Sequence, residues 1–275
     1  MTIKLKAATS DPVFYPEMGP GLLAHIAASS RLFQFMTTTL IAAILASTSA
    51  TDENLKTLDA ISFHDQPGVL YVRLRQVAVA FDSALVRGAG QWHFANMPVQ
   101  PENTRKLYDG TQLIRLGALR HHNFMMNWDP TKKRATLKAA NRPGKAVYVR
   151  RGDQRVVVNK SHLMLVAWQG ESVVFRSQVG IGRLGYESPN GNFKVQNYRA
   201  KMHYSSLYNN TPMPWAVQIV GNVFIHGSPQ ARGRSSHGCI RLATSGRNPA
   251  KWFYMWAERG TPVAIQGHWP AGSKP

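Results

Sequence analysis

The sequence predicts a mainly β, sandwich-like domain in its C-terminal half, preceded by a small α+β accessory domain. Several short runs there are rich in β-branched residues and end at turn-forming pairs, as strands of an antiparallel sheet do. Gln169-Gly170 and Gly221-Asn222 are the two clearest hairpin turns. The runs are 156–158, 163–168, 172–179, 216–220 and 223–226. Many short strands at regular spacing favour a sandwich or barrel over a doubly wound parallel sheet.

One helix is expected near the C-terminal end. Asn248 can cap it, Pro249 suits its first position, and Gly260 suits a position beyond its end. An aromatic stripe on this helix is interpreted as core packing rather than as a ligand site. The stripe consists of Trp252, Phe253 and Trp256. Residues 261–266 then read as a closing strand.

Composition shifts divide the 275 residues into a leader, two modules and a tail. The Pro-Gly pair in 141–144 indicates a linker between the modules. The expected bounds are 1–51 for the leader, 52–140 for the accessory domain, 145–267 for the second domain and 268–275 for the tail.

The leader contains a mainly apolar run at 32–46, followed by small residues. This pattern is typical of a signal peptide, so we expect an exported protein of the periplasm or cell envelope. An uncleaved membrane anchor at 32–46 and a buried helix are the alternatives, although the run is short for a membrane span.

The accessory domain holds a weak internal repeat. Residues 71–77 (YVRLRQV) match 113–119 (LIRLGAL), 42 positions later. The repeat resembles the N-terminal stalk domain of copper amine oxidases, and an unrelated α+β spacer is the alternative. The adjacent histidines His121 and His122 diverge on either a strand or a helix, so they are expected at or near the surface rather than on a metal.

The net charge of +19 favours anionic partners. Residues 141–275 carry most of it, with 18 Lys and Arg against four acidic residues. These basic residues are scattered rather than striped, and no nucleic-acid module accompanies them, so nucleic acid is not an expected partner.

Cys239 is the only cysteine, so it has no disulfide partner within the chain. His237 and Gly238 precede it directly, and His226-Gly227 lies thirteen residues before it. A free thiol is mostly protonated at neutral pH, and a neighbouring imidazole that accepts its proton turns it into a nucleophile. An inert buried cysteine is the alternative, but packing alone does not require the flanking glycines.

His226 is preferred over His237 as the base. His226 ends a predicted strand and Cys239 begins another, so a short loop can bring the two together. His237 is adjacent in sequence, so its side chain is expected to point away from the thiol. Because residues 188–257 contain no Asp or Glu, a backbone carbonyl such as that of Gly227 is expected to orient the imidazole.

Backbone N–H groups of Gly238 and Cys239 are the expected donors to an oxyanion. Arg241 and Arg234 are expected to bind substrate carboxylates and to lower the thiol pKa, with Arg232 as a further nearby cation, whereas Arg247 reads as a solvated loop charge. Zinc on Cys239, His226 and His237 would lack a fourth ligand, so we expect neither a metal nor another cofactor.

These motifs resemble the L,D-transpeptidase catalytic domain of the YkuD family, over residues of about 146–266. His226-Gly227 is similar to the family's first His-Gly motif. The segment Ser236-His237-Gly238-Cys239-Ile240-Arg241 is similar to its second. Supporting segments are 180–182, 188–193 and 213–215. The loop between His226 and Cys239 is shorter than usual, and Asn190 replaces the usual threonine, which bears on substrate shape.

The resemblance implies a β-rich enzyme of the bacterial envelope that acts on peptidoglycan. Cys239 would attack a tetrapeptide stem at the bond before the terminal D-alanine, release D-alanine and form a thioester. An amine on a second stem, or on an envelope protein, would resolve it. Ser236 is expected in the substrate site, and carbapenems are expected to acylate Cys239.

Two other functions remain open. With water as the acceptor, the same scaffold would be an L,D-carboxypeptidase or hydrolase. With an incidental thiol, the chain would be a basic, non-catalytic wall-binding protein.

Overall fold

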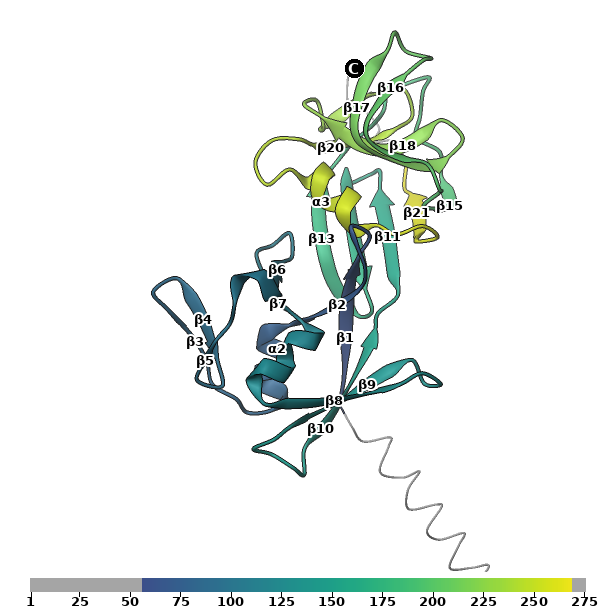
Figure 1. The fold of residues 1–275 in the computed structure, drawn as a ribbon. Coiled ribbons are helices and arrows are strands. Elements are labelled where there is room, and N and C mark those ends of the chain that lie inside the picture. The colour runs from purple at the N-terminus through teal and green to yellow at the C-terminus, as the bar shows by residue number, and fades with distance from the viewer. Residues whose placement is uncertain (1–55, 269–275) are drawn as a thin grey trace, which may run out of the picture. The chain divides into compact units, whose positions relative to one another are not determined.

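The computed structural model describes residues 56–268 and is mainly β (Figure 1). The predicted leader at 1–51, its apolar run at 32–46 and residues 269–275 of the predicted tail lie outside this range. None of the helices between residues 56 and 268 is long and apolar enough to cross a membrane.

The N-terminal part is built on a seven-stranded sheet of order β6-β7-β2-β1-β10-β9-β8. Its strands are β1 (Thr57–Phe63), β2 (Gln66–Arg73), β6 (Thr104–Lys106), β7 (Gln112–Arg115), β8 (Phe124–Asp129), β9 (Arg134–Ala139) and β10 (Ala146–Arg151). A second, three-stranded sheet contains β3 (Leu85–Gly88), β4 (Gln91–Phe94) and β5 (Met97–Pro98). The helical segments are α2 (Leu74–Ala80), η1 (Pro101–Asn103) and η2 (Leu116–His122).

The internal repeat has a structural counterpart. Each copy is a strand that passes directly into a helical segment: β2 into α2, and β7 into η2. The two strands pair antiparallel, with Val72 opposite Ile114. Within the second copy His122 is buried against the carbonyl of Phe94, whereas His121 is exposed.

Residues 141–144, which we predicted as a linker, form the turn between β9 and β10. These strands pair antiparallel, with Val147 opposite Leu137, and β10 also pairs in parallel with β1. Strand pairing has overridden the expectation drawn from Pro143-Gly144, because the same residue types also suit a hairpin turn. The division into domains at 140 and 145 stays a prediction.

The C-terminal part contains two further sheets and one helix, as the sequence predicts. The five-stranded sheet, of order β13-β12-β11-β21-β15, contains β11 (Gln154–Asn159), β12 (Met164–Gln169), β13 (Ser172–Gln178), β15 (Gly191–Lys194) and β21 (Pro262–Gln266). The six-stranded sheet, of order β16-β17-β18-β20-β14-β19, contains β14 (Gly180–Gly182), β16 (Arg199–Ser205), β17 (Thr211–Val220), β18 (Val223–Ser228), β19 (Gly233–Ser236) and β20 (Ile240–Ala243).

Both predicted hairpin turns form. Gly170 and Glu171 connect β12 to β13, one residue further along than predicted because Gln169 still pairs with Ser172, and Gly221 and Asn222 connect β17 to β18. The predicted helix is α3 (Pro249–Trp256), where the Asn248 side chain accepts a hydrogen bond from the Lys251 N–H at 2.9 Å.

The main core joins the two C-terminal sheets through α3. Trp252, Phe253 and Trp256 of the aromatic stripe are buried there, which confirms their packing role. Val158 of the five-stranded sheet and Ile225 of the six-stranded sheet belong to the same cluster. The six-stranded sheet therefore has one face toward this core and presents its other face to a separate, smaller apolar cluster.

Candidate active site

Parallel pairing of β18 with β20 places the two halves of the cysteine–histidine motif side by side. Ile225 lies opposite Ile240, and His226 lies opposite Arg241. Ile225 and Ile240 face the main core, whereas Phe224 and Cys239 belong to the cluster on the other face. Because side chains alternate along a strand, His226 shares the face of Phe224. The thirteen-residue spacing thus places both functional groups on one face of the sheet.

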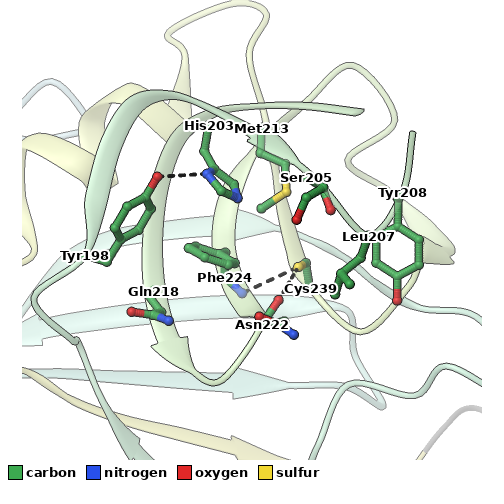
Figure 2. Close-up of a pocket in the computed structure, with 11 residues that line it drawn as sticks. Tyr198, His203, Ser205, Leu207, Tyr208, Met213, Gln218, Asn222, Phe224 and Cys239 are labelled. Carbon is green, nitrogen blue, oxygen red and sulfur yellow. Dashed lines mark hydrogen bonds between the residues drawn. The ribbon is translucent and has the colours of Figure 1, made fainter. Parts of the chain in front are cut away.

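Cys239 lines a pocket of about 300 Å³ on this face (Figure 2). Its Sγ accepts a hydrogen bond from the Phe224 N–H at 3.4 Å and donates to the Asn222 carbonyl oxygen at 3.6 Å. The pocket is lined by Tyr198, His203, Ser205, Ser206, Leu207, Tyr208, Met213, Gln218, Asn222, Phe224 and Cys239. The thiol is therefore open to a ligand rather than sealed in the core.

His226 is buried, with 3% of its surface exposed. Its Nδ1 lies 2.8 Å from the carbonyl oxygen of Gly227. This oxygen only accepts hydrogen bonds, so Nδ1 carries the proton and Nε2 keeps its lone pair. Burial lowers the pKa of His226 to about 4, and the positive charge of Arg241 acts in the same direction. The imidazole is therefore neutral at pH 7.

No hydrogen bond joins Cys239 Sγ to His226 within residues 56–268. The sulfur instead forms hydrogen bonds with Asn222 in the β17–β18 turn and with Phe224 near the start of β18.

Burial raises the pKa of the Cys239 thiol above its ordinary value. The Phe224 N–H and the charge of Arg241 oppose this effect without reversing it. Arg241 thus lowers the thiol pKa, as expected of a nearby arginine, but the desolvation of the thiol outweighs this effect. At rest the site therefore holds a neutral thiol and a neutral imidazole rather than a thiolate–imidazolium pair.

The side chain of Ser236 stabilises the turn formed by residues 236–239. The buried Ser236 hydroxyl donates to the Cys239 carbonyl oxygen at 2.6 Å and accepts from the Gly238 N–H at 3.1 Å. Gly238 has a φ of +109°, a conformation that favours glycine. The Gly238 N–H, a predicted oxyanion donor, is thus engaged by Ser236, and the predicted role of Ser236 in substrate binding stays a prediction.

Gly227 is required by its surroundings. A Cβ at this position would lie 2.7 Å from Thr244 Cγ2, 3.0 Å from the Pro214 carbonyl oxygen and 3.1 Å from Ala250 Cβ. The absence of a side chain lets β18 approach β17 and α3 closely. The carbonyl that orients His226 is held in place by this packing.

The ring of His237 lies between two tyrosines. Tyr208, at the β16–β17 turn, stacks on it with ring centroids 4.1 Å apart, and Tyr186 meets it edge-on at 4.9 Å. His237 thereby connects the Cys239 turn to the β16–β17 hairpin.

The arginines are less directly placed at the pocket than we expected. Arg241 Nη1 donates to the carbonyl oxygen and hydroxyl of Ser235, at 3.1 and 3.0 Å. Arg234 lies in β19, where it pairs with Ile181. Arg247, expected to be solvated, donates to the Tyr108 carbonyl oxygen at 2.9 Å. None of the three is among the pocket-lining residues that the structure describes.

Several residues that line the pocket were not predicted from the sequence. Tyr198, His203, Tyr208 and Asn222 all line it, but no motif or spacing marks them. His203 reaches the site because β16 pairs with β17, which places it opposite Met213. Across residues 56–268, no group of three or more His, Cys, Asp or Glu side chains is arranged to hold a metal ion.

Residues 153–265 match the family model of the L,D-transpeptidase catalytic domain, YkuD. No curated protein matches the chain.

Solved structures of L,D-transpeptidases are similar in part. A protein of Stackebrandtia nassauensis is 23% identical, with a TM-score of 0.40, over 45% of this chain and 58% of that one. Proteins of Mycobacterium smegmatis and Mycobacterium tuberculosis H37Rv are 14% and 15% identical, with TM-scores of 0.38 and 0.39. Each of these two matches covers 77% of this chain and 94% of the other.

Proposed function

We propose that this chain, whose residues 153–265 form a YkuD L,D-transpeptidase catalytic domain, transfers the acyl part of a peptidoglycan stem peptide to an amine through a thioester on Cys239. One observation carries the proposal. The thiol of Cys239 opens into a pocket on the same sheet face as His226, a buried, neutral imidazole oriented by the Gly227 carbonyl. This is a nucleophile and base arrangement in which a backbone oxygen replaces the usual carboxylate.

In the first step, Cys239 turns toward His226, and Nε2 takes the thiol proton as sulfur attacks the carbonyl carbon before the terminal D-alanine. Because the thiol pKa is raised and that of His226 is lowered, the proton moves together with the attack rather than before it. His226 then gives the proton to the departing D-alanine nitrogen, and the C–N bond breaks to leave a thioester.

In the second step, an amine attacks the thioester carbonyl and loses its proton to His226. The C–S bond breaks, and the proton returns to the Cys239 sulfur. The oxyanion formed in each step needs backbone donors. We assign the Cys239 N–H to this role, and the Gly238 N–H joins it if its bond to the Ser236 hydroxyl opens.

The identity of the acyl acceptor distinguishes the proposed transpeptidase from a hydrolase, and the absence of any acyl transfer would indicate a wall-binding protein. Purified protein is incubated with tetrapeptide-containing muropeptides, and the products are identified by mass. Released D-alanine with cross-linked dimers supports the transpeptidase. Tripeptides without dimers would instead indicate a hydrolase, and unchanged peptides that remain bound would indicate a wall-binding protein. Cys239→Ala should abolish both product types and leave binding intact.

We also propose an extracytoplasmic location in the bacterial envelope, where this substrate lies. The supporting observation is the apolar run at 32–46 followed by small residues. Fractionation of cells that produce the full chain with a C-terminal tag tests it, and recovery of the protein only in the cytoplasm would refute it.

A further inference from the structure

A second imidazole, that of His203, lies on the wall of the Cys239 pocket and has no role in the mechanism above. Its Nδ1 is 2.8 Å from the Tyr198 hydroxyl oxygen. Its ring stacks on Phe224, with centroids 5.1 Å apart and planes inclined by 23°. The Tyr198 ring meets both of these rings edge-on, at 5.4 and 5.9 Å. Two aromatic rings, those of Tyr198 and Phe224, thus hold the imidazole in a single orientation (Figure 2).

The contact with Tyr198 decides which hydrogen-bonding group His203 offers to the pocket. In the tautomer in which the phenolic hydroxyl of Tyr198 donates to Nδ1, that nitrogen is the acceptor. The ring proton then lies on Nε2. Protonation of the ring adds a proton at Nδ1 and leaves the Nε2–H in place. Nε2 is therefore a donor in both charge states.

The Nε2 of His203 is available to a ligand. Within residues 56–268 it has no hydrogen-bond partner, since the only hydrogen bond of this side chain is the one to Tyr198. Figure 2 shows this nitrogen turned away from Tyr198, toward the side of the pocket where Met213 and Cys239 lie.

The remaining pocket wall suits an anionic group. Ser205, Tyr208, Gln218 and Asn222 line it and carry neutral side-chain donors. The lining residues that the structure describes include no Asp or Glu to repel an anion and no Lys or Arg to bind one. His203 is the one lining residue of this pocket whose side chain offers an imidazole N–H.

We infer that His203 determines specificity for a carboxylate: its Nε2–H binds the terminal carboxylate of the acyl-donor peptide, one residue beyond the carbonyl that Cys239 attacks. Tyr198 acts as a positioning residue, because it fixes the tautomer and the plane of the imidazole. The inference rests on the proposed function and names the group of that substrate which the pocket recognises.

Binding to a protein that cannot turn over tests this inference directly. In the Cys239→Ala background, affinities are measured for a tetrapeptide ending in D-alanine and for the same peptide ending in D-alaninamide. We expect the acid to bind about tenfold more tightly, as a hydrogen bond to a charged group typically gives. Adding His203→Phe, which keeps a ring stacked on Phe224, should remove this preference and leave the affinity for the amide unchanged.

Two further variants distinguish recognition from packing. His203→Gln, which keeps a terminal N–H donor, should restore part of the preference for the acid, and Tyr198→Phe should reduce it in part. His121→Phe, at an exposed imidazole in η2, is the matched control and should change neither affinity.

The inference is overturned if the His203→Phe variant retains the preference for the acid, or if the substitution lowers the binding affinity for both peptides equally. The proposed function fails separately, if the wild-type chain neither binds nor turns over either peptide, and the role of His203 then falls with it. Turnover of both peptides with a preference that is independent of His203 would refute only the inference.

Discussion

The Nδ1 of His226 lies 2.8 Å from the carbonyl oxygen of Gly227, the next residue in its own strand. The imidazole is thus oriented by the chain that carries it, with no carboxylate required. The tautomer leaves the Nε2 lone pair for proton transfer, and burial keeps the ring neutral.

The pH dependence of acylation should reflect the low pKa of His226. Its pKa is about 4, so the base stays unprotonated down to this pH, and kcat/KM for D-alanine release should fall only as the pH falls through about 4. His226→Asn should reduce kcat/KM by about 10²–10⁴-fold at pH 7, the usual contribution of a general base. An acid limb near 6.5 would contradict the assignment.

His226 should also make stability depend on pH. Its pKa is about 4 when folded and near 6.5 when unfolded, so between these values the unfolded chain binds the extra proton. The free energy of unfolding should therefore decrease as the pH falls from 6.5 to 4, by about 3 kcal/mol from this group. Urea unfolding at pH 7 and pH 4.5 measures it, and His226→Asn should show a shallower slope than the wild type.

Alkylation of Cys239 should require unusually alkaline conditions. Burial raises the thiol pKa, so the rate with iodoacetamide at pH 7 should be lower than that of a free cysteine and should level off at a higher pH than for a free cysteine. Arg241→Gln should shift the pH dependence of the alkylation rate to still higher pH, because it removes a positive charge that stabilises the thiolate. Rapid alkylation at pH 7 would show instead a preformed thiolate.

Gly227→Ala should lower both stability and activity. The added Cβ would meet Thr244 and the Pro214 carbonyl at 2.7 and 3.0 Å, so β18 must shift. The Gly227 carbonyl that orients His226 would move with the strand. We expect a loss of about 1–3 kcal/mol, as for other overpacked sites, measured by urea unfolding. Gly117→Ala is the matched control, since a Cβ there meets nothing within 4 Å. Equal effects of the two substitutions would refute the packing argument.

Ser236→Ala should weaken the turn that presents Cys239. The substitution removes a buried hydroxyl that bonds both the Cys239 carbonyl and the Gly238 N–H, which should cost about 1–3 kcal/mol. D-Alanine release should fall with little change in KM, because the turn rather than the pocket is altered. Ser245→Ala, at an exposed serine, is the control. A changed KM with an unchanged kcat would instead favour direct substrate contact by Ser236.

The turns, the helix and the neighbouring positions of His226 and Cys239 could be predicted from local patterns. Gly221-Asn222 suits a hairpin and Asn248-Pro249 a helix start whatever surrounds them, because backbone conformation decides both. The expectation for Pro143-Gly144 was wrong because the same residues suit a linker and a hairpin, and only the pairing of β9 with β10 distinguishes them.

The sequence by itself determined the chemistry that the site can offer: one thiol, a nearby imidazole, and a neighbourhood without acidic residues. The tertiary structure decided how these groups behave. Burial, which depends on contacts between distant segments, raises the pKa of Cys239 and lowers that of His226. The pairing of β16 with β17 brings His203 into the pocket, and no local pattern reports such a pairing, because it depends on the register between two strands.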